Sequence, residues 1–429
     1  MRIAHSVEAA RQLVRKHRPD YQLVIYTGIL LLFGLIVLYA ISPARVETLE
    51  SSGASIDEAH FMQRQLLYLI AGIIAFFVAN LIPLAKWKQF AGKLLIIALI
   101  LCVLLVFFGA INAPVALCSG GACRWFNLGI GTFQPAELLK FSVLLFLAAF
   151  LARRMKQGSI NNLHDTLIPL GIITGIAVIF VIGFQKDMGT GLSLIGIIAA
   201  MLYLAGINKR MGLIVLSAIV ALSIIFIIIA PHRLARVTTF LGQDTSEDAK
   251  TSSYHINQAK IALGTGGLFG LGLGRNVQAF GYLPEAPNDS IFAVMGEAFG
   301  FVGVVAILLF MTGLLLRLLH ILDRTEEHMY RLIIAGVFGW LATHIVLNIG
   351  AMVGLIPLTG ITLPLLSFGG TSLLFIMLAL GLVFNISRYT VHGKIIDDET
   401  EKKASSDGRR WVGRARDAAP VGHRRTRSR

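Results

Sequence analysis

Charged side chains are scarce in this sequence. Asp, Glu, Lys and Arg together make up 14% of the 429 residues, whereas 55% of the residues are hydrophobic. A soluble domain carries about 25% charged residues, so the composition excludes an ordinary soluble protein. The composition is instead that of a polytopic membrane protein.

Cysteines are also few, and recognisable cofactor motifs are missing. The sequence has three cysteines and contains no zinc-ligand spacing, no G-x-x-x-x-G-K-[ST] loop and no serine-hydrolase elbow. ATP is therefore not expected to drive the activity, no metal site is predicted, and a divalent cation is left open. Cys102 lies within an apolar run, while Cys118 and Cys123 flank a short Ser-Gly-Gly-Ala loop. Those two could form a disulfide or stay reduced.

Long apolar runs are the dominant positive feature. Ten runs have about the 20 residues that cross a membrane as helix, and none alternates as a membrane β-strand does. They begin near Tyr21, Gln65, Lys93, Phe133, Thr166, Met188, Met211, Ser290, Leu332 and Ser367. The predicted fold is all-α, with ten transmembrane helices in a membrane domain over residues 21–388. Residues 1–20 form a cytoplasmic segment, and residues 389–429 form a basic tail predicted to be disordered.

The distribution of Lys and Arg predicts the orientation of the helices, because short loops rich in these residues stay in the cytoplasm. Basic clusters precede the first run and follow the second, fourth, sixth and eighth runs. Both termini are therefore predicted to be cytoplasmic, and residues 232–289 form a long extracytoplasmic loop between helices seven and eight. The net charge of +14 is interpreted as this orientation signal and as attraction to anionic membrane lipid, so no nucleic-acid partner is expected.

A turn-rich stretch before the eighth run carries the main candidate site. It reads YLPEAPNDSIFAVMGE and contains Glu285, Asp289 and Glu297. Asp289 lies where a helix would begin, so it could cap that helix or act as an acid at the mouth of a membrane helix. Glu297 follows eight residues later on the same helical face, which predicts a polar cleft along the helix.

Further polar groups interrupt apolar sequence elsewhere. Glu137 and Lys140 are three residues apart and can pair, either to line a cavity or simply to allow insertion. Asp187 lies in a short polar break that could line a substrate path or form a tight turn capped by the aspartate. His344 and Asn348 share a helical face and could make interhelical hydrogen bonds or line the cleft, and the hydrogen-bonding interpretation is favoured.

Two segments rich in glycine have different interpretations. The stretch Gly264–Arg275 has glycines without the preceding strand of a nucleotide-binding fingerprint, so close backbone packing is favoured over binding of an anion. In the segment 354–372, prolines and glycines interrupt what would be membrane helix. Irregular backbone at that depth must be buried in protein or face water, so this segment is predicted to line the cleft.

Several motifs in a fixed order resemble one known family. They are Arg124-Trp125 followed by FQPAELLK, then FQKDMGTGLSL, INQAKIALGTGGLFGLGLG, YLPEAPNDSIFAVMGE and LPLLSFGGTSLLFIMLALGLVFNISR. Together they resemble the SEDS family, the FtsW, RodA and SpoVE proteins of bacterial shape, elongation, division and sporulation. The resemblance covers roughly Tyr21 to Arg388. It departs from the usual pattern at Lys186, where a proline is common, and in lacking a histidine just before Asp289.

The resemblance implies a multi-pass protein of the bacterial cytoplasmic membrane that polymerises lipid II, an undecaprenyl-linked disaccharide-peptide, into peptidoglycan on the outer face. Asp289 would be the catalytic base that accepts the proton of the acceptor hydroxyl. By the same resemblance, the expected cleft residues are Glu137, Lys140, Asp187, Glu285 and Ser367. The leaving undecaprenyl diphosphate needs cations, for which the candidates are Arg124, Lys140, Arg233, Arg236 and Arg275.

The resemblance also implies partners and leaves two alternatives open. Expected partners are a class B penicillin-binding transpeptidase and other membrane proteins of the divisome or elongasome, with the wording of YLPEA and LPLTGITLPLLSFGG favouring the division branch. One alternative is a flippase that moves lipid II across the membrane. The other is a scaffold that recruits the transpeptidase without chemistry of its own.

Overall fold

The computed structural model describes residues 18–51, 60–119, 122–129, 131–228 and 247–390. Nearly all of these residues belong to one compact unit, Lys16–Tyr389. The predictions made for residues 1–17, for most of the tail and for Arg233 and Arg236 lie outside the described residues. Among the described residues, the helices long enough to cross a membrane all belong to this unit.

Each predicted apolar run lies on a helical segment. The segments are α2 (Tyr21–Ser51), α3 (His60–Leu81), α4 (Leu84–Ala110), α5 (Pro135–Lys156), α6 (Ile168–Val178) with the flanking π-helices η1 (Leu163–Leu167) and η2 (Ile179–Phe184), α7 (Met188–Leu204), α8 (Lys209–Ile228), α11 (Ile291–Asp323), α12 (His328–Met352) and α13 (Thr371–Ile386). Within the described residues, eight segments are long and apolar enough to cross a membrane, and α7 is a shorter apolar helix. The fold is that of a polytopic membrane protein. The count of ten crossings stays a prediction.

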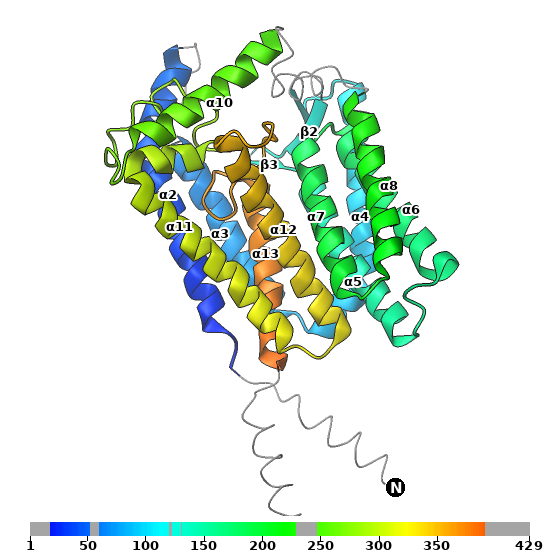
Figure 1. The fold of residues 1–429 in the computed structure, drawn as a ribbon. Helices are drawn as coiled ribbons and strands as arrows, with labels where there is room; N and C mark the ends of the chain where they lie inside the picture. Colours follow the sequence, from blue (N-terminus) through cyan, green and yellow to red (C-terminus); the bar gives the residue numbers. More distant parts are fainter. Residues whose placement is uncertain (1–17, 52–59, 120–121, 130, 229–246, 391–429) are drawn as a thin grey trace, which may run out of the picture. The chain divides into compact units, whose positions relative to one another are not determined.

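The helices differ in how much protein surrounds them. In Figure 1, α12 and α13 lie in the middle of the bundle, with α11 and α2 on one side and α7, α4 and α8 on the other. α5 and α13 are largely buried, and they pack against α4 and α3 respectively. α3, α4 and α11 expose many large apolar side chains, as expected of helices that face lipid.

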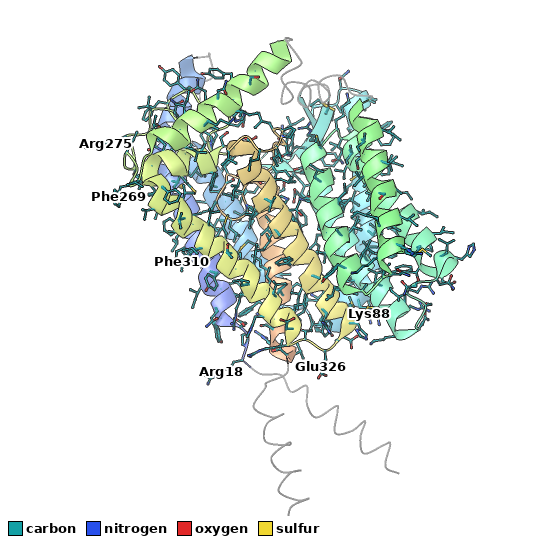
Figure 2. All side chains as sticks on the ribbon, in the orientation of Figure 1. Arg18, Lys88, Phe269, Arg275, Phe310 and Glu326 are labelled. Atoms are coloured by element: carbon teal, nitrogen blue, oxygen red, sulfur yellow. A yellow bond between two sulfur atoms is a disulfide. The ribbon has the colours of Figure 1, made fainter. Side chains whose placement is uncertain are left out.

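The two ends of the bundle agree with the predicted orientation. Arg18 and Lys88 lie at one end in Figure 2, together with Glu326 from the turn between α11 and α12. All three belong to segments predicted to be cytoplasmic. The strand β2 and the helix α10, which come from segments predicted to be outside, lie at the opposite end in Figure 1.

A small sheet and one helix were not predicted from the sequence. The strands β1 (Ala116–Ser119), β2 (Ala122–Asn127) and β3 (Thr132–Phe133) form an antiparallel sheet in that order. Cys118 and Cys123 face each other across β1 and β2 and form a disulfide, the alternative that the sequence left open. The predicted loop 232–289 contains α10 (Glu247–Thr265). These elements are short or polar, so they lack the long apolar signal on which the prediction depended.

The glycine-rich stretch after α10 packs against a break in α11. Gly300 has φ 66° and ψ −167°, which interrupts the helix, and the positive φ suits a residue without a Cβ. Four backbone hydrogen bonds of 2.8–3.1 Å join the two segments. The N–H groups of Leu271 and Gly272 donate to the carbonyls of Glu297 and Ala298. In the other direction, the N–H groups of Phe301 and Val302 donate to the carbonyls of Gly267 and Leu268. The favoured interpretation of these glycines, close backbone packing, is confirmed.

Glu297 does not extend the cleft, so that prediction was wrong. Its side chain is fully buried and accepts hydrogen bonds from the backbone N–H groups of Val277 and Gln278, at 2.9 and 3.1 Å from Oε1. The carboxylate therefore holds the loop before Asp289 onto α11. Helical spacing predicted the face on which Glu297 lies, but not that a loop would cover that face.

Replacing Gly266 with alanine is expected to destabilise the protein by about 1–3 kcal/mol. An added Cβ would lie 2.0 Å from the carbonyl oxygen of Gly296, which is backbone and cannot rotate away. Gly264→Ala is the matched control, because a Cβ there meets nothing within 4 Å and the position is helical. Thermal unfolding of the two purified variants measures the difference. Equal stability would contradict the close packing of the loop on α11.

Candidate active site

A cavity of about 560 Å³ lies where the predicted outer ends of several segments meet. Its walls come from α3, from β2 and the start of α5, from the polar break before α7, from the turn before α11, from α12, and from the irregular segment before α13. The prediction that residues 354–372 line a cleft is confirmed for Thr359–Thr362 and Phe368–Ser372. The polar break likewise lines the cavity, through Lys186, Asp187, Met188 and Thr190.

Asp289 lies in the wall of this cavity and is 9% exposed. The N-cap residue of α11 is Ser290 rather than Asp289, and the Ser290 side chain makes no capping hydrogen bond. The capping interpretation of Asp289 is therefore not supported. Its backbone is held by Asn348 of α12, whose Nδ2 donates to the Asp289 carbonyl at 2.7 Å and to the Ile361 carbonyl at 2.7 Å.

The turn that presents Asp289 is built around Glu285. Glu285 has φ 50°, an unusual value for a residue with a side chain, and its carbonyl accepts the Asn288 N–H at 2.9 Å. The Asn288 side chain also donates to the Glu285 carboxylate. Phe368 N–H then donates to the Pro287 carbonyl at 2.8 Å. The turn is thus joined to the irregular segment, and Glu285, Asn288 and Asp289 all line the cavity.

A histidine that the sequence did not single out supports the same turn. His255 of α10 is buried, and its Nε2 lies 2.5 Å from Ser290 Oγ. Ser290 Oγ donates its proton to the Pro284 carbonyl at 2.8 Å, so it accepts from a protonated Nε2 of His255. The polar start of the motif INQAKIALGTGG comes directly after His255. That proximity to a family motif was the only available signal.

The predicted pair of Glu137 and Lys140 exists and belongs to a larger network. Lys140 Nζ lies 2.8 Å from Glu137 Oε1, 3.3 Å from His344 Nε2 and 4.7 Å from the centre of the Trp340 ring. Trp340 Nε1 also donates to His344 Nε2 at 3.1 Å. With two donors at Nε2, the neutral imidazole must carry its proton on Nδ1, which faces the Thr362 carbonyl at 3.2 Å.

The two ends of this network differ in their access to the cavity. Glu137 and His344 line the cavity, whereas Lys140 is fully buried behind them. Lys140 is therefore placed to hold Glu137, and not to contact a ligand directly. Of the two residues favoured for interhelical hydrogen bonding, His344 makes such a bond, to Lys140 of α5. Asn348 instead donates to carbonyls of the irregular segment and of the turn before α11. The alternative, that this face lines the cleft, is confirmed for His344.

Asp187 combines both roles considered for it. Its carboxylate accepts from the Thr190 N–H at 2.9 Å and the Thr190 hydroxyl at 2.8 Å, which caps α7. It also accepts from Gln134 Nε2 at 2.8 Å and lines the cavity. Arg124 fixes the same break, since its guanidinium donates to the carbonyls of Gln185 and Lys186 at 3.2 and 2.8 Å.

The cationic side chains around the cavity agree only in part with those expected, since Arg124 was predicted and Arg64 and Lys186 were not. Among the described residues, Arg64, Arg124 and Lys186 line it. Arg64 was not predicted, because it precedes the second apolar run and looks like an ordinary flanking charge. Arg275 lies at the edge of the molecule near Phe269 in Figure 2 and does not line the cavity.

Ser367 lies beside the cavity without lining it. Its buried side chain accepts a hydrogen bond from the Leu363 N–H at 2.8 Å. The side chain therefore shapes the turn that precedes the lining residues Phe368–Ser372. Within the described part of the chain, no three His, Cys, Asp or Glu side chains are grouped so as to hold a metal ion.

Replacing Asn348 with alanine is expected to lower the polymerisation activity that the family resemblance implies, and to lower it by more than the loss of stability explains. The change removes two hydrogen bonds and is expected to cost about 2 kcal/mol, but it also frees the backbone of Asp289. Asn385→Ala is the matched control, because Asn385 Nδ2 donates to the carbonyls of Ala79 and Ile82 and lies outside the cavity. The activity of equal amounts of folded protein is compared. Equal activities would refute a positioning role for Asn348.

The fold and the site define a multi-pass membrane protein with an acid-lined polar cavity, and comparisons with known proteins identify its family. A family model described as "Cell cycle protein", for FtsW, RodA and SpoVE, matches residues 21–392. The chain therefore belongs to the FtsW/RodA/SpoVE family.

Two curated relatives illustrate how far the similarity extends. Stage V sporulation protein E of Bacillus subtilis is 36% identical over 381 residues, which cover 88% of this chain and 99% of that protein. A protein named probable peptidoglycan glycosyltransferase FtsW, from Thiomicrospira cyclica, is 36% identical over 368 residues, covering 83% and 91% of the two chains.

Solved structures agree with this assignment. The crystal structure of the rod shape determining protein RodA of Thermus thermophilus matches with a TM-score of 0.62 and 26% identity, over 86% of this chain and 97% of that one. A chain from a peptidoglycan synthase complex, whose structure is described as coordinating polymerization and crosslinking, matches with a TM-score of 0.66 and 26% identity. That match covers 86% of this chain and 98% of the other.

Proposed function

We propose that this protein is a peptidoglycan glycosyltransferase that polymerises lipid II at the outer face of the cytoplasmic membrane. The observation that carries the proposal is the position of Asp289. It is a nearly buried acid in the wall of a polar cavity, at the end of the bundle predicted to face outward. Membership of a family with members named as peptidoglycan glycosyltransferases supports the same activity.

In the proposed reaction, Asp289 acts as a general base. Its carboxylate accepts the proton of the acceptor sugar's 4-hydroxyl while that oxygen attacks the anomeric carbon of the donor. A new glycosidic C–O bond forms, and the C–O bond to the diphosphate breaks. Undecaprenyl diphosphate leaves with the bonding electron pair. The diphosphate bond of the substrate supplies the driving force, so the reaction needs no nucleotide.

The other predicted site residues have distinct proposed roles. Glu137, Asp187 and Glu285 line the cavity and can contact sugar or peptide groups of the substrate, with Lys140 holding Glu137 in place. Arg124 acts mainly through the backbone of the polar break, because its guanidinium donates to two carbonyls there. Ser367 shapes the turn before the last helix. A contribution of Arg233, and a divalent cation held with the substrate, stay predictions.

Partners are proposed at two levels. The match to a chain from a peptidoglycan synthase complex supports association with other enzymes of cell-wall synthesis. More specifically, we propose a class B penicillin-binding transpeptidase as the direct partner, within a divisome or elongasome. The domain boundaries proposed for this chain remain residues 1–20, 21–388 and 389–429, with the terminal segments in the cytoplasm.

Incubation of the purified protein with lipid II, with and without its transpeptidase partner, tests this function. Glycan strands resolved by gel electrophoresis are the expected product. A parallel assay in vesicles follows movement of labelled lipid II between leaflets. Translocation without polymer would favour the flippase, and neither activity, with the transpeptidase still recruited, would favour the scaffold.

A further inference from the structure

The N-terminus of α13 opens toward the cavity after an unusual turn. Gly370, the N-cap residue, has φ 47° and ψ −121°, and no side chain caps this end of the helix among the described residues. Phe368–Ser372 line the cavity. The first N–H groups of a helix have no partner within the helix, and the helix dipole makes that end attractive to anions. In α13 the Ser372 N–H donates to the Gly369 carbonyl of the preceding turn at 2.8 Å, so the other N–H groups of the first turn are the available donors. A helix of 16 residues is long enough for both effects.

Two buried hydroxyls in the cavity wall lack a hydrogen-bond partner within the described part of the chain. Ser372 and Thr359 line the cavity and are 7% and 8% exposed, and neither Ser372 Oγ nor Thr359 Oγ1 has a hydrogen bond among those residues. Several buried hydroxyls elsewhere in the helices donate to a carbonyl three or four residues earlier, as Thr27, Ser142 and Ser193 do. An unpaired buried hydroxyl is costly, so this pair indicates a site for a ligand with acceptor oxygens.

A cation from α3 lies on the same side of the cavity. Arg64 lines the cavity, and within the described residues its guanidinium has no hydrogen bond or ion pair. Phe61 and Tyr68, three residues before and four after, share its helical face. The Phe61 ring packs against the Phe368 ring with centroids 5.7 Å apart, and Tyr68 lies next to Gly370. Both neighbours of Arg64 on that face thus border the start of α13.

We propose that the start of α13, with Ser372, Thr359 and Arg64, binds the diphosphate of a lipid-linked substrate. The inference rests on the proposed function, because a lipid diphosphate leaves in that reaction. Helix N–H groups, hydroxyls and a guanidinium all donate to phosphate oxygens and stabilise the charge that develops as the diphosphate departs. No step requires these groups to accept a proton.

Hydrogen bonds on two sides connect the proposed diphosphate site to the turn that carries Asp289. Phe368 N–H donates to the Pro287 carbonyl at 2.8 Å, two residues before Asp289. On the side of Thr359, Asn348 binds the carbonyls of both Ile361 and Asp289. These bonds fix the diphosphate site relative to Asp289, as an enzyme that moves a sugar from a leaving group to an activated hydroxyl requires.

Binding of farnesyl diphosphate to the full-length protein in detergent, measured by titration calorimetry, tests the proposal. Ser372→Ala and Thr359→Val are each expected to weaken binding about tenfold, and Arg64→Gln at least as much. Ser223→Ala is the matched control, because this hydroxyl of α8 is buried, lies outside the cavity and donates to the Ile219 carbonyl. It should leave binding unchanged. Farnesol, which lacks the diphosphate, should not compete with farnesyl diphosphate for binding. Inorganic pyrophosphate is titrated in the same way, to show whether the site prefers free or lipid-linked diphosphate.

The outcomes separate the diphosphate site from the proposed function. Three results would overturn the site. The Ser372→Ala/Thr359→Val double variant could keep its full affinity for farnesyl diphosphate, farnesol could bind as tightly as farnesyl diphosphate, or neither diphosphate could bind to the unmodified protein. Asp289→Asn should keep the affinity while losing polymerisation. Protein that binds farnesyl diphosphate through these hydroxyls but makes no glycan from lipid II would retain the site and refute the function. Because Ser372→Ala removes an unpaired hydroxyl, its thermal stability should not fall, and loss of binding with full stability supports the site.

Discussion

Asp289→Asn is expected to reduce glycan polymerisation from lipid II by about a hundredfold or more. Asparagine has nearly the same shape, but its amide cannot accept the proton of the attacking hydroxyl. The side chain lies in the cavity wall, and Asn348 holds the backbone through the Asp289 carbonyl, which the substitution leaves in place. The fold should therefore survive. The initial rate of glycan formation at saturating lipid II, with equal amounts of folded protein, is the measurement.

Two comparisons make this result specific. Asp323→Asn changes the same chemical group at the other end of α11, outside the cavity, and is expected to leave the rate unchanged. Glu285→Gln alters the second acid of the same turn and is expected to have the smaller effect, because Glu285 is assigned to substrate contact. Glycan strands that persist at the normal rate in Asp289→Asn would refute the catalytic assignment.

Lys140→Met is expected to destabilise the protein by about 3–5 kcal/mol. The substitution keeps the length and apolar stem of the side chain but removes the ammonium group, which lies 2.8 Å from Glu137 Oε1 and 3.3 Å from His344 Nε2. The carboxylate of Glu137 would then be buried without its cation, and its other oxygen already has no hydrogen-bond partner among the described residues. Chemical unfolding in detergent measures the loss.

An exposed ion pair provides the control for this prediction. Lys156 and Glu327 are also 2.8 Å apart, but their side chains are 55% and 44% exposed, so Lys156→Met should cost at most about 1 kcal/mol. Combining Lys140→Met with Glu137→Gln should recover part of the lost stability, because no unpaired charge remains. Activity should not recover in the double variant, since Glu137 lines the cavity. Equal losses from Lys140→Met and Lys156→Met would refute the buried network.

The spacing of side chains along a helix predicted pairs correctly but not their surroundings. Glu137 and Lys140 pair as their separation of three residues implies. The same reasoning placed Glu297 on the face of Asp289, where a backbone loop covers it. Which loop packs on a helix depends on contacts distant in sequence, so helical periodicity alone cannot distinguish a cavity wall from a buried anchor. The carbonyl of Asp289, for example, is held by a residue 59 positions away.

The sequence by itself determined the membrane-spanning helices, because a helix in lipid satisfies its own backbone hydrogen bonds and needs only a sufficiently long apolar run. It also determined which polar stretches interrupt those runs, and the family that their order identifies. The tertiary structure alone decided that six separate segments surround one cavity, that Arg64 and His255 belong near the site, and that Lys140 lies behind it. A binding site depends on which side chains meet across helices, and that is a property of packing rather than of local sequence.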